Sequence, residues 1–261
     1  MPDDAFDLLQ KPLREQVAKL DIAEASDIQR LAIPPILDGK NALLIAPTGT
    51  GKTLAAVLPV FDLFVAARSR DETRGISILY VTPLRALNRD ILRRLSDMGA
   101  ELGIKVQVRH GDTATATRVL QARSPPDMLI TTPETLQAIL PGKRMRQHLR
   151  NVRWVVVDEI HELATDKRGV QLALGLERLR NLTNRDFQRI GLSATVGDED
   201  RIAKFLAGSE RDAVIVKSKE GRGFEVTVDY VSPTSTDRER SEKFSVPPSS
   251  IGRARRIAQL I

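Results

Sequence analysis

The stretch NALLIAPTGTGKT at residues 41–53 decides the fold of this chain. Its first part, residues 41–46, is mostly apolar and predicts a buried strand. A glycine-rich turn follows, and the Gly-Lys-Thr triplet at residues 51–53 opens a predicted helix. Because a glycine-rich loop between a strand and a helix presents backbone amides to phosphate groups, these residues predict a nucleotide-binding loop.

The residues of this loop suit ATP with Mg²⁺. Gly49 and Gly51 let the backbone approach the phosphates, and Lys52 is expected to reach the β- and γ-phosphates. The hydroxyl of Thr53 is a suitable ligand for Mg²⁺, a hard cation that prefers oxygen. The general pattern begins with glycine, where this chain has Ala46. The candidate nucleotide-binding residues of the loop are Thr48, Gly49, Thr50, Gly51, Lys52 and Thr53.

A second motif, WVVVDEIH at residues 154–161, places two acids at the end of an apolar strand. Asp158 is expected to hold Mg²⁺ through water, and Glu159 to orient or deprotonate the attacking water. Two solvated acids at a strand end are the plain alternative. Another alternative is a metal-hydrolase cluster with His161 and Glu162, although the spacing does not match HExxH. Together with the phosphate loop, the motif indicates an ATPase site whose catalytic residues are Lys52, Asp158 and Glu159.

Strand and helix patterns alternate along the chain. Predicted strands lie at residues 41–46, 76–82, 105–109, 128–131, 154–158, 189–193 and 213–216. Predicted helices lie at residues 5–20, from 26 with an interruption at Pro34 and Pro35, from 51, from 83 to 98 and from 133. This alternation predicts an α/β fold with a mostly parallel sheet and helices on both faces. Ligands of such sheets bind at the carboxyl ends of the strands, where both motifs fall.

The C-terminal part of the chain has a different pattern. Residues 224–231 predict a strand, and residues 232–250, rich in Ser, Pro and charge, predict a linker or flexible loop. A helix is expected from residue 251, and it stops at residue 261 without a capping residue. We therefore expect an ATP-binding domain at residues 1–220, followed at residues 221–261 by a linker and the truncated start of a second domain.

Composition limits the classes of partner. The net charge of +6, from 40 Lys and Arg against 34 Asp and Glu, permits a polyanionic partner without requiring one. Aromatic residues make up only 4%, so contacts to a nucleic acid would be mainly to its backbone rather than by base stacking. The absence of cysteine, of a signal peptide and of an apolar run of about 20 residues favours a cytoplasmic protein with no membrane segment.

The motifs together resemble a known family. APTGTGKT at residues 46–53, DEIH at 158–161 and SAT at 193–195 resemble, in this order, superfamily 2 helicases of the DEAD/DEAH-like group. The resemblance implies a RecA-like fold and places Gln29 where that family has an adenine-reading glutamine, although an ordinary surface glutamine is the alternative. TPLRALNRD at 82–90 resembles motif Ia, TTPETL at 131–136 resembles motif Ib, and RHGDT at 109–113 resembles a further loop that faces nucleic acid.

Two groups of residues gain expected roles from this resemblance. In the family, the SAT motif couples the nucleotide site to the nucleic-acid track, which implies coupling roles for His161, Ser193 and Thr195. The residues expected to contact nucleic acid are Pro83, Arg85, Gly111, Asp112, Thr132, Pro133 and Glu134. Helix N-terminal amides and an arginine at such positions can hold phosphates, but Thr-Pro pairs are also ordinary helix starts.

Three segments of the chain are similar in sequence to the large helicase-related (Lhr) proteins: LYVTPLRALNRD, WVVVDEIHELATDKRGVQLALGLERL and RIGLSATVGD. That resemblance implies an ATP-driven translocase on single-stranded DNA, moving 3′–5′ and linked to repair, with DNA favoured over RNA. It also implies a second RecA-like domain as a partner. We find no Q-x-x-G-R-x-x-R arginine-finger motif after Thr195, and such a finger is worth about 10³–10⁵ in rate.

The chain alone is therefore expected to bind ATP and to hydrolyse it slowly or not at all. Three other functions stay open at this point. An RNA helicase shares every motif above, and a nucleotide-dependent scaffold that never unwinds would share most of them. A small-molecule kinase would share the phosphate loop but would not explain DEIH together with SAT.

Overall fold

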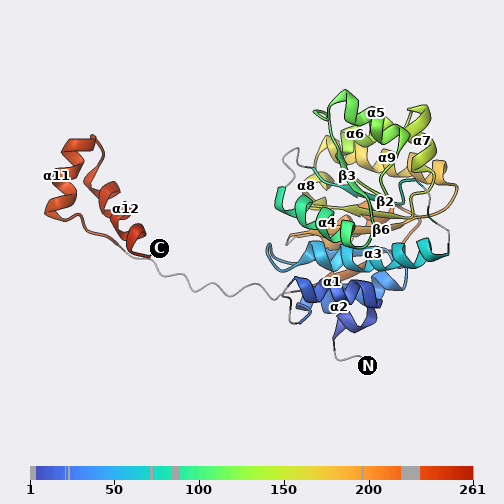
Figure 1. Ribbon diagram of the computed structural model, residues 1–261, viewed down its shortest axis with the longest axis horizontal. Coiled ribbons are helices and arrows are strands. Elements are labelled where there is room, and N and C mark those ends of the chain that lie inside the picture. The colour runs from blue at the N-terminus through green and yellow to red at the C-terminus, as the bar shows by residue number, and fades with distance from the viewer. Residues whose placement is uncertain are drawn as a thin grey trace. The chain divides into compact units, whose positions relative to one another are not determined.

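The computed structural model describes residues 4–20, 22, 24–70, 73, 75–83, 89–194, 197–218 and 230–260. The chain divides into two compact units, Met1–Arg222 and Gly223–Ile261. Figure 1 shows the elements of both units. The first unit contains the sheet and all the motifs quoted above, so it is the unit that bears on function.

Within the described residues, the first unit contains one seven-stranded sheet in which neighbouring strands are parallel. The order across the sheet is β3-β4-β2-β5-β6-β1-β7. The strands are β1 (Ala42–Ile45), β2 (Ile78–Val81), β3 (Val106–Arg109), β4 (Met128–Thr131), β5 (Trp154–Val157), β6 (Gln188–Ser193) and β7 (Val214–Lys217). The inner strands are buried along their whole length, which explains their near-continuous apolar sequences.

Helices cover both faces of this sheet, so the predicted α/β fold is confirmed (Figure 1). One face packs against α1 (Lys11–Lys19), α2 (Asp27–Leu37), α3 (Lys52–Ser69) and α4 (Arg89–Glu101). The other packs against α6 (Pro133–Ile139), α7 (Lys143–Leu149), α8 (Ile160–Ala164), α9 (Lys167–Thr183) and α10 (Glu199–Ala207), and α5 (Thr115–Arg123) lies beside α7. Among the described residues, no helix is both long and apolar enough to cross a membrane.

The single helix predicted at residues 5–20 is wrong. The structure has a 3-10 helix, η1 (Ala5–Leu8), and then α1, and the residues between them are extended. The backbone amide of Gln10 donates to Asp62 Oδ1 at 2.7 Å, and Gln10 Nε2 donates to the Asp62 carbonyl at 3.0 Å. These bonds to α3 hold the chain in an extended conformation, so a tertiary contact overrides the helical periodicity.

The interruption predicted at Pro34 and Pro35 is also wrong, because α2 runs through both residues to Leu37. Each proline removes one backbone hydrogen bond, but both lie in the last turn of the helix. The buried side chains of Ile28, Ile33 and Ile36 hold α2 against the core. Their burial offsets the two lost bonds.

The second unit corrects the linker prediction. Residues 235–244 form α11 (Ser235–Phe244), and α12 (Pro248–Leu260) begins before the expected residue 251. A capping box starts α11, in which the Thr234 amide donates to Asp237 Oδ2 at 3.0 Å. This bond and the nearby Arg255 guanidinium lower the pKa of Asp237 to about 2. Of the predicted strand 224–231, only Tyr230 and Val231 are among the described residues, and neither is in a strand.

Candidate nucleotide and nucleic-acid site

The phosphate loop runs from the end of β1 to Gly51, the N-cap of α3. Gly49 and Gly51 have φ angles of +79° and +92°, in the left-handed region that favours glycine. A Cβ atom at Gly51 would lie 2.7 Å from Gln29 Nε2, so the end of the Gln29 side chain would have to shift. The loop therefore needs glycine here for two independent reasons, and its amides and the start of α3 point to an anion.

Lys52 folds back over this loop. Its ammonium donates to the carbonyl oxygens of Ala46 at 2.5 Å and Pro47 at 2.8 Å. Burial lowers the pKa of Lys52, and the nearby charges of Glu159 and Asp158 partly offset that effect. The ammonium thus lies at the centre of the loop, beside the two acids of the DEIH motif.

Gln29 lies against the phosphate loop and is only 3% exposed. Its Oε1 accepts from the Ser26 amide at 2.9 Å, and its Nε2 donates to the Gly51 carbonyl at 3.4 Å. The Ser26 hydroxyl donates to the Thr50 carbonyl at 2.9 Å. The ordinary surface glutamine is therefore excluded, and the start of α2 is hydrogen-bonded to the loop.

Asp158 follows β5 and points to the face of the sheet that α3 covers. Both of its carboxylate oxygens have partners: Oδ1 accepts from the Glu159 amide at 3.0 Å, and Oδ2 accepts from the Tyr80 hydroxyl at 2.7 Å. Burial raises the pKa of Asp158, and the hydrogen bond from Tyr80 acts against that rise. Tyr80 is fully buried, and the side chain of Thr53 lies near enough to its hydroxyl to lower the pKa of Tyr80, so Tyr80 is close to both residues expected to hold Mg²⁺.

Glu159 adopts φ 45° and ψ 44°, a left-handed conformation that is costly for a residue other than glycine. Burial and the charge of Asp158 raise the pKa of Glu159. Its carboxylate lies 3.6 Å from His161 Nδ1, and the same nitrogen lies 3.1 Å from Ser193 Oγ. An unbroken chain of polar contacts thus leads from the DEIH motif to the end of β6. Thr195 lies outside the described residues.

The phosphate loop, Asp158 and Glu159 line one cavity of about 420 Å³. The cavity wall combines phosphate-loop backbone, one ammonium, two carboxylates and the Thr53 hydroxyl. Its lining residues are Thr48, Gly49, Gly51, Lys52, Thr53, Leu54, Arg94, Leu95, Asp158 and Glu159. Glycine amides and a lysine suit phosphates, and hydroxyl and carboxylate oxygens suit a hard cation. The lining residues therefore fit a nucleoside triphosphate with Mg²⁺.

The residues expected to contact nucleic acid lie at the carboxyl ends of β2, β3 and β4. Thr132 is the N-cap of α6 and Pro133 is its first residue. Glu134 forms an ion pair with Arg168 of α9, and Arg168 Nη2 also donates to the carbonyl of Pro83. Arg168 therefore joins the motif Ia and motif Ib segments.

The loop after β3 carries two more of the expected residues. Gly111 and Asp112 are exposed, and Arg118 Nη2 donates to the Gly111 carbonyl. The Asp112 amide donates to His110 Nδ1 at 3.2 Å, which closes the loop on itself. Arg85 lies outside the described residues.

Comparison with known proteins agrees with this geometry. A family model described as DEAD/DEAH box helicase matches residues 26–202. This chain belongs to the DEAD/DEAH box helicase family. A solved structure of the Mycobacterium smegmatis helicase Lhr, bound to single-stranded DNA and AMP-PNP, is similar with a TM-score of 0.78. It is 35% identical, and the match covers 93% of this chain and 33% of that one.

Curated relatives support the Lhr resemblance, which is confirmed. The ATP-dependent helicase Lhr-Core of Methanocaldococcus jannaschii is 41% identical over 244 residues, covering 88% of this chain and 28% of that protein. The Lhr helicase/uracil glycosylase of Escherichia coli is 41% identical over 193 residues, covering 67% of this chain and 12% of that protein. The helicase domain described here thus spans about a quarter of the Lhr-Core protein and an eighth of the E. coli protein.

Two residues of the helicase site lie within the quoted Lhr-like stretches, but the sequence analysis gave them no role. Tyr80 lies inside a predicted strand, and it pairs with Val156 in the register of β2 and β5. Since side chains alternate along a strand, Tyr80 shares a face with Asp158, two residues beyond Val156. Arg168 lies on α9, beyond the DEIH motif, and nothing at its own position signals its contacts. For Tyr80, the available signal in the sequence was a tyrosine within an otherwise aliphatic strand.

Proposed function

We propose that this chain is the ATP-binding first motor domain of an ATP-dependent DNA helicase or translocase of the Lhr type. The observation that carries the proposal is the line of polar contacts from Asp158 through Glu159 and His161 to Ser193, which begins near the charge of Lys52. A plain nucleotide-binding site has no need of such a line. A motor needs it, because the state of the nucleotide must change how the protein holds its track.

The roles of the residues follow from their chemistry. The loop amides and Lys52 would hold the phosphates of ATP, and Gln29 would read adenine after turning from Gly51. Thr53 and Asp158 would hold Mg²⁺, which supplies neutralisation of phosphate charge when it is bound. Glu159 is placed to take a proton from water or to orient it. The raised pKa of Glu159, caused by burial and by Asp158, makes it a better proton acceptor than an exposed glutamate.

A second RecA-like domain would complete the catalytic site. Support comes from the sequence, which has no Q-x-x-G-R-x-x-R motif after Thr195. An arginine finger stabilises the transition-state charge on the phosphate. Without it, ATP hydrolysis is expected to be slower by a factor of about 10³–10⁵. The chain by itself is therefore expected to bind ATP and to turn it over slowly. The unit from Gly223 to Ile261 is proposed to be the entry into that second domain.

DNA is the proposed track, with movement 3′–5′ and a role in repair. Support comes from the printed description of the M. smegmatis neighbour, which is bound to single-stranded DNA. At motif Ib, Thr132 caps the N-terminus of α6, and helix N-terminal amides can hold phosphates of either DNA or RNA. An RNA helicase is therefore the competing function, and the choice of nucleic acid has to be measured.

The test compares the wild-type chain with Lys52→Ala, and uses Lys40→Ala as the matched control because Lys40 is an exposed lysine away from the loop. Wild type and Lys40→Ala should bind fluorescent ATP with Mg²⁺, and Lys52→Ala should not. All three should bind single-stranded DNA. Tighter binding of RNA than of DNA would favour the RNA helicase, and vigorous DNA-stimulated hydrolysis by the chain alone would refute the need for a second domain.

A further inference from the structure

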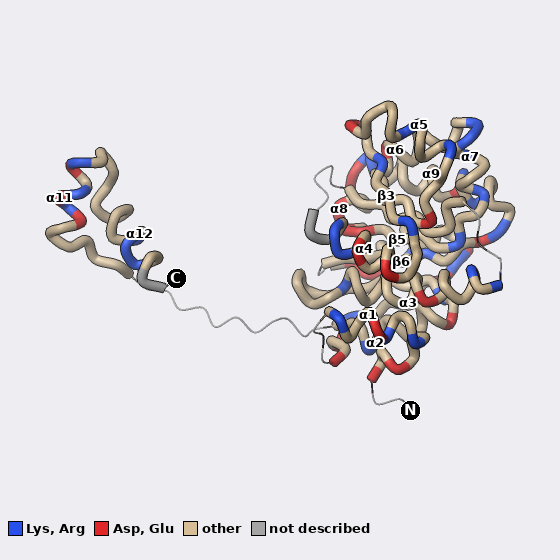
Figure 2. Tube along the Cα trace, viewed as in Figure 1, with Lys and Arg blue, Asp and Glu red and all other residues tan. Residues whose placement is uncertain are grey.

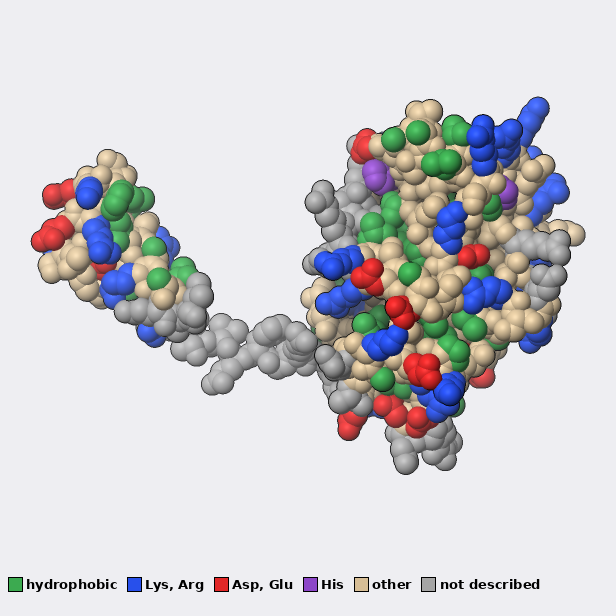
Figure 3. Space-filling view, in the orientation of Figure 1, with side chains coloured by type: hydrophobic (Ala, Val, Ile, Leu, Met, Phe, Trp, Pro, Cys, Tyr) green, Lys and Arg blue, Asp and Glu red, His purple; other side chains and the backbone are tan. Residues whose placement is uncertain are grey.

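A group of cations lies on the face of the sheet opposite the phosphate loop's helix, over α5, α7 and α9. We call it the α7 surface, and it consists of Arg123, Lys143, Arg144, Arg146, Arg150 and Arg178, all exposed. Figure 3 shows Lys and Arg side chains gathered over α5 and α7 at the upper right. Residues 135–157 include five Lys or Arg and no Asp or Glu, so no acid of this segment balances their charge.

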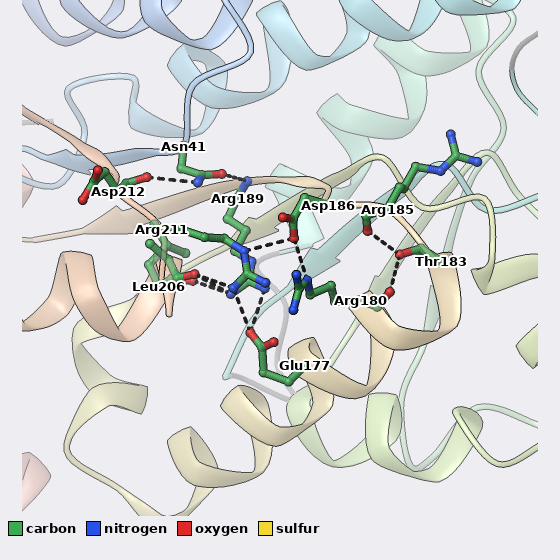
Figure 4. A network of polar contacts seen from close by, with 11 residues as sticks. Asn41, Glu177, Arg180, Thr183, Arg185, Asp186, Arg189, Leu206, Arg211 and Asp212 are labelled. Carbon is green, nitrogen blue, oxygen red and sulfur yellow. Dashed lines mark hydrogen bonds and ion pairs between the residues drawn. The ribbon is translucent and has the colours of Figure 1, made fainter. Parts of the chain in front are cut away.

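Five of the six cations of the α7 surface have no partner among the described residues. Within the part of the chain that the structure describes, no hydrogen bond or ion pair is formed by the side chains of Arg123, Lys143, Arg144, Arg146 and Arg150. Arginines elsewhere in the domain behave differently. Figure 4 shows Arg180, Arg189 and Arg211 sharing Glu177 and Asp186 at the ends of α9 and β6. The α7 surface thus concentrates positive charge that the protein itself leaves uncompensated.

A cavity of about 460 Å³ lies within this surface. Arg146, Arg178 and Asn181 line it together with the apolar Leu140, Pro141 and Leu182. Arg178 Nη1 donates to Gln137 Oε1 at 2.7 Å, a neutral partner that fixes the guanidinium and leaves its charge free. Two guanidinium groups and an amide around one hollow suit a phosphate group, which accepts several hydrogen bonds at once.

The helix α6 leads along the chain from the expected nucleic-acid track to the α7 surface. Thr132 caps α6, which has seven residues and ends just before α7. Such a helix is about 10 Å long, a distance that about three successive phosphates of a stacked strand cover. The loop carrying Gly111 and Asp112 likewise leads directly into α5. A strand that leaves the track at motif Ib and runs along α6 would reach the α7 surface.

From these observations we propose that the α7 surface is a second nucleic-acid-binding surface, which holds backbone phosphates beyond the strand-end track. The inference rests on the proposed function. Binding there is independent of sequence, because no aromatic side chain lies among these residues to stack on bases. The phosphates can belong to a continuing single strand or to a duplex at a fork, and both present the same charge.

The experiment measures the affinity of the chain for a labelled 30-mer single strand and for a forked duplex between 50 and 200 mM salt. The variant is Arg144→Gln, Arg146→Gln and Arg150→Gln together. The matched control is Lys11→Gln, Arg14→Gln and Lys19→Gln, three exposed cations of α1 on the other face of the sheet. Both variants lose three charges, so a difference between them reports position rather than net charge.

We expect the α7 variant to reduce the slope of log affinity against log salt by about 2 on the single strand, since each lost phosphate contact removes about 0.7. Between 50 and 200 mM salt, the factor by which affinity falls would then be roughly 20 times smaller for the variant than for the wild type. A second variant, Arg123→Gln with Lys143→Gln, should reduce the slope by about 1.4. An effect confined to the forked duplex would assign the phosphates to a duplex and would equally support the surface.

Equal slopes of log affinity against log salt for wild type and the α7 variant, on both substrates, would overturn the inference. This holds even if the α7 surface proved to bind a different partner, such as an acidic protein. Unfolding midpoints check that the variants are folded, which is expected for the α7 variants because their side chains have no partners among the described residues. The control loses the exposed ion pairs of Lys11 with Glu15 and of Lys19 with Glu101, each worth about 0.2–1 kcal/mol. If the wild-type chain bound neither substrate, the proposed function would fail and this inference with it. If wild type bound DNA and only the α7 slopes were unchanged, the proposed function would stand.

Discussion

The Tyr80 hydroxyl donates a hydrogen bond of 2.7 Å to Asp158 Oδ2, from the neighbouring strand of the sheet. With the Glu159 amide on Oδ1, this bond fixes the carboxylate in one orientation. The bond also favours the charged form of Asp158 in a buried place that disfavours it. The strand register of β2 against β5 thus sets the geometry of the acid that the proposed Mg²⁺ site needs.

Replacing Tyr80 with Phe should weaken Mg²⁺-dependent binding of ATP more than binding of ATP without the metal. The change removes one oxygen and leaves Asp158 Oδ2 without its buried donor, at a cost of about 1–3 kcal/mol in the free energy of unfolding. Titration of Mg²⁺ against fluorescent ATP measures the first effect, and urea unfolding the second. Tyr230→Phe is the control, because Tyr230 is 85% exposed, and it should change neither. An unaltered Mg²⁺ titration for Tyr80→Phe would show that the bond does not position Asp158.

Replacing Asp158 with Asn should stabilise the ligand-free chain near pH 8 and abolish binding of ATP with Mg²⁺. Burial raises the pKa of Asp158 above its unfolded value, so the folded state binds more protons in the window between the two. The stability of the wild type therefore falls as pH rises through that window, and asparagine lacks this loss. Urea unfolding should show a larger gain for Asp158→Asn at pH 8 than at a pH near 3.8, the ordinary pKa of an aspartate. An equal gain at both values would refute the raised pKa as its cause.

Replacing Gly51 with Ala should reduce ATP affinity as well as stability. The left-handed backbone costs an alanine about 1–2 kcal/mol, and its Cβ would also lie 2.7 Å from Gln29 Nε2. Gly39→Ala separates these effects, because Gly39 has φ +77° with no atom within 4 Å of an added Cβ. We expect Gly39→Ala to lose stability alone in thermal unfolding. Unchanged ATP affinity in Gly51→Ala would show that the contact with Gln29 does not shape the loop.

Replacing Arg168 with Gln should weaken binding of single-stranded DNA while ATP affinity stays the same. Arg168 ties Glu134 of motif Ib to the Pro83 carbonyl of motif Ia, so its loss releases both segments. The ion pair is partly exposed and is worth about 0.2–1 kcal/mol at most, so the fold should survive. A double-mutant cycle with Glu134→Gln measures the coupling in DNA affinity. Strictly additive losses would mean that the pair does not act as a unit.

The sequence predicted the parts of the fold that local patterns encode. Apolar strands followed by a glycine-rich loop or by acids gave the parallel sheet and placed Lys52, Asp158 and Glu159 at one edge. The structure also brings together Ser193 and His161, two residues for which the family resemblance implied coupling roles. The roles of these residues remain predictions.

What the sequence did not predict depends on contacts between distant segments. The partnership of Tyr80 with Asp158 needs the register of two strands, and the bridge made by Arg168 needs α9 to lie beside α6. The extended residues before α1 are held by Asp62, far along the chain. The α11 helix is a different case, because the capping residues Thr234 and Asp237 were readable and the Ser- and Pro-rich composition outweighed them.

The bonds between the start of α2 and the phosphate loop have a consequence for nucleotide selectivity. Gln29 and Ser26 hold the carbonyls of Gly51 and Thr50, so a base that engages Gln29 must loosen the same segment that grips phosphate. Recognition of the base and binding of the triphosphate are then thermodynamically linked through these hydrogen bonds. A polyphosphate without a purine would leave the hydrogen bonds of Gln29 and Ser26 to the loop intact. Selectivity for adenine would then reflect the free energy needed to break these bonds.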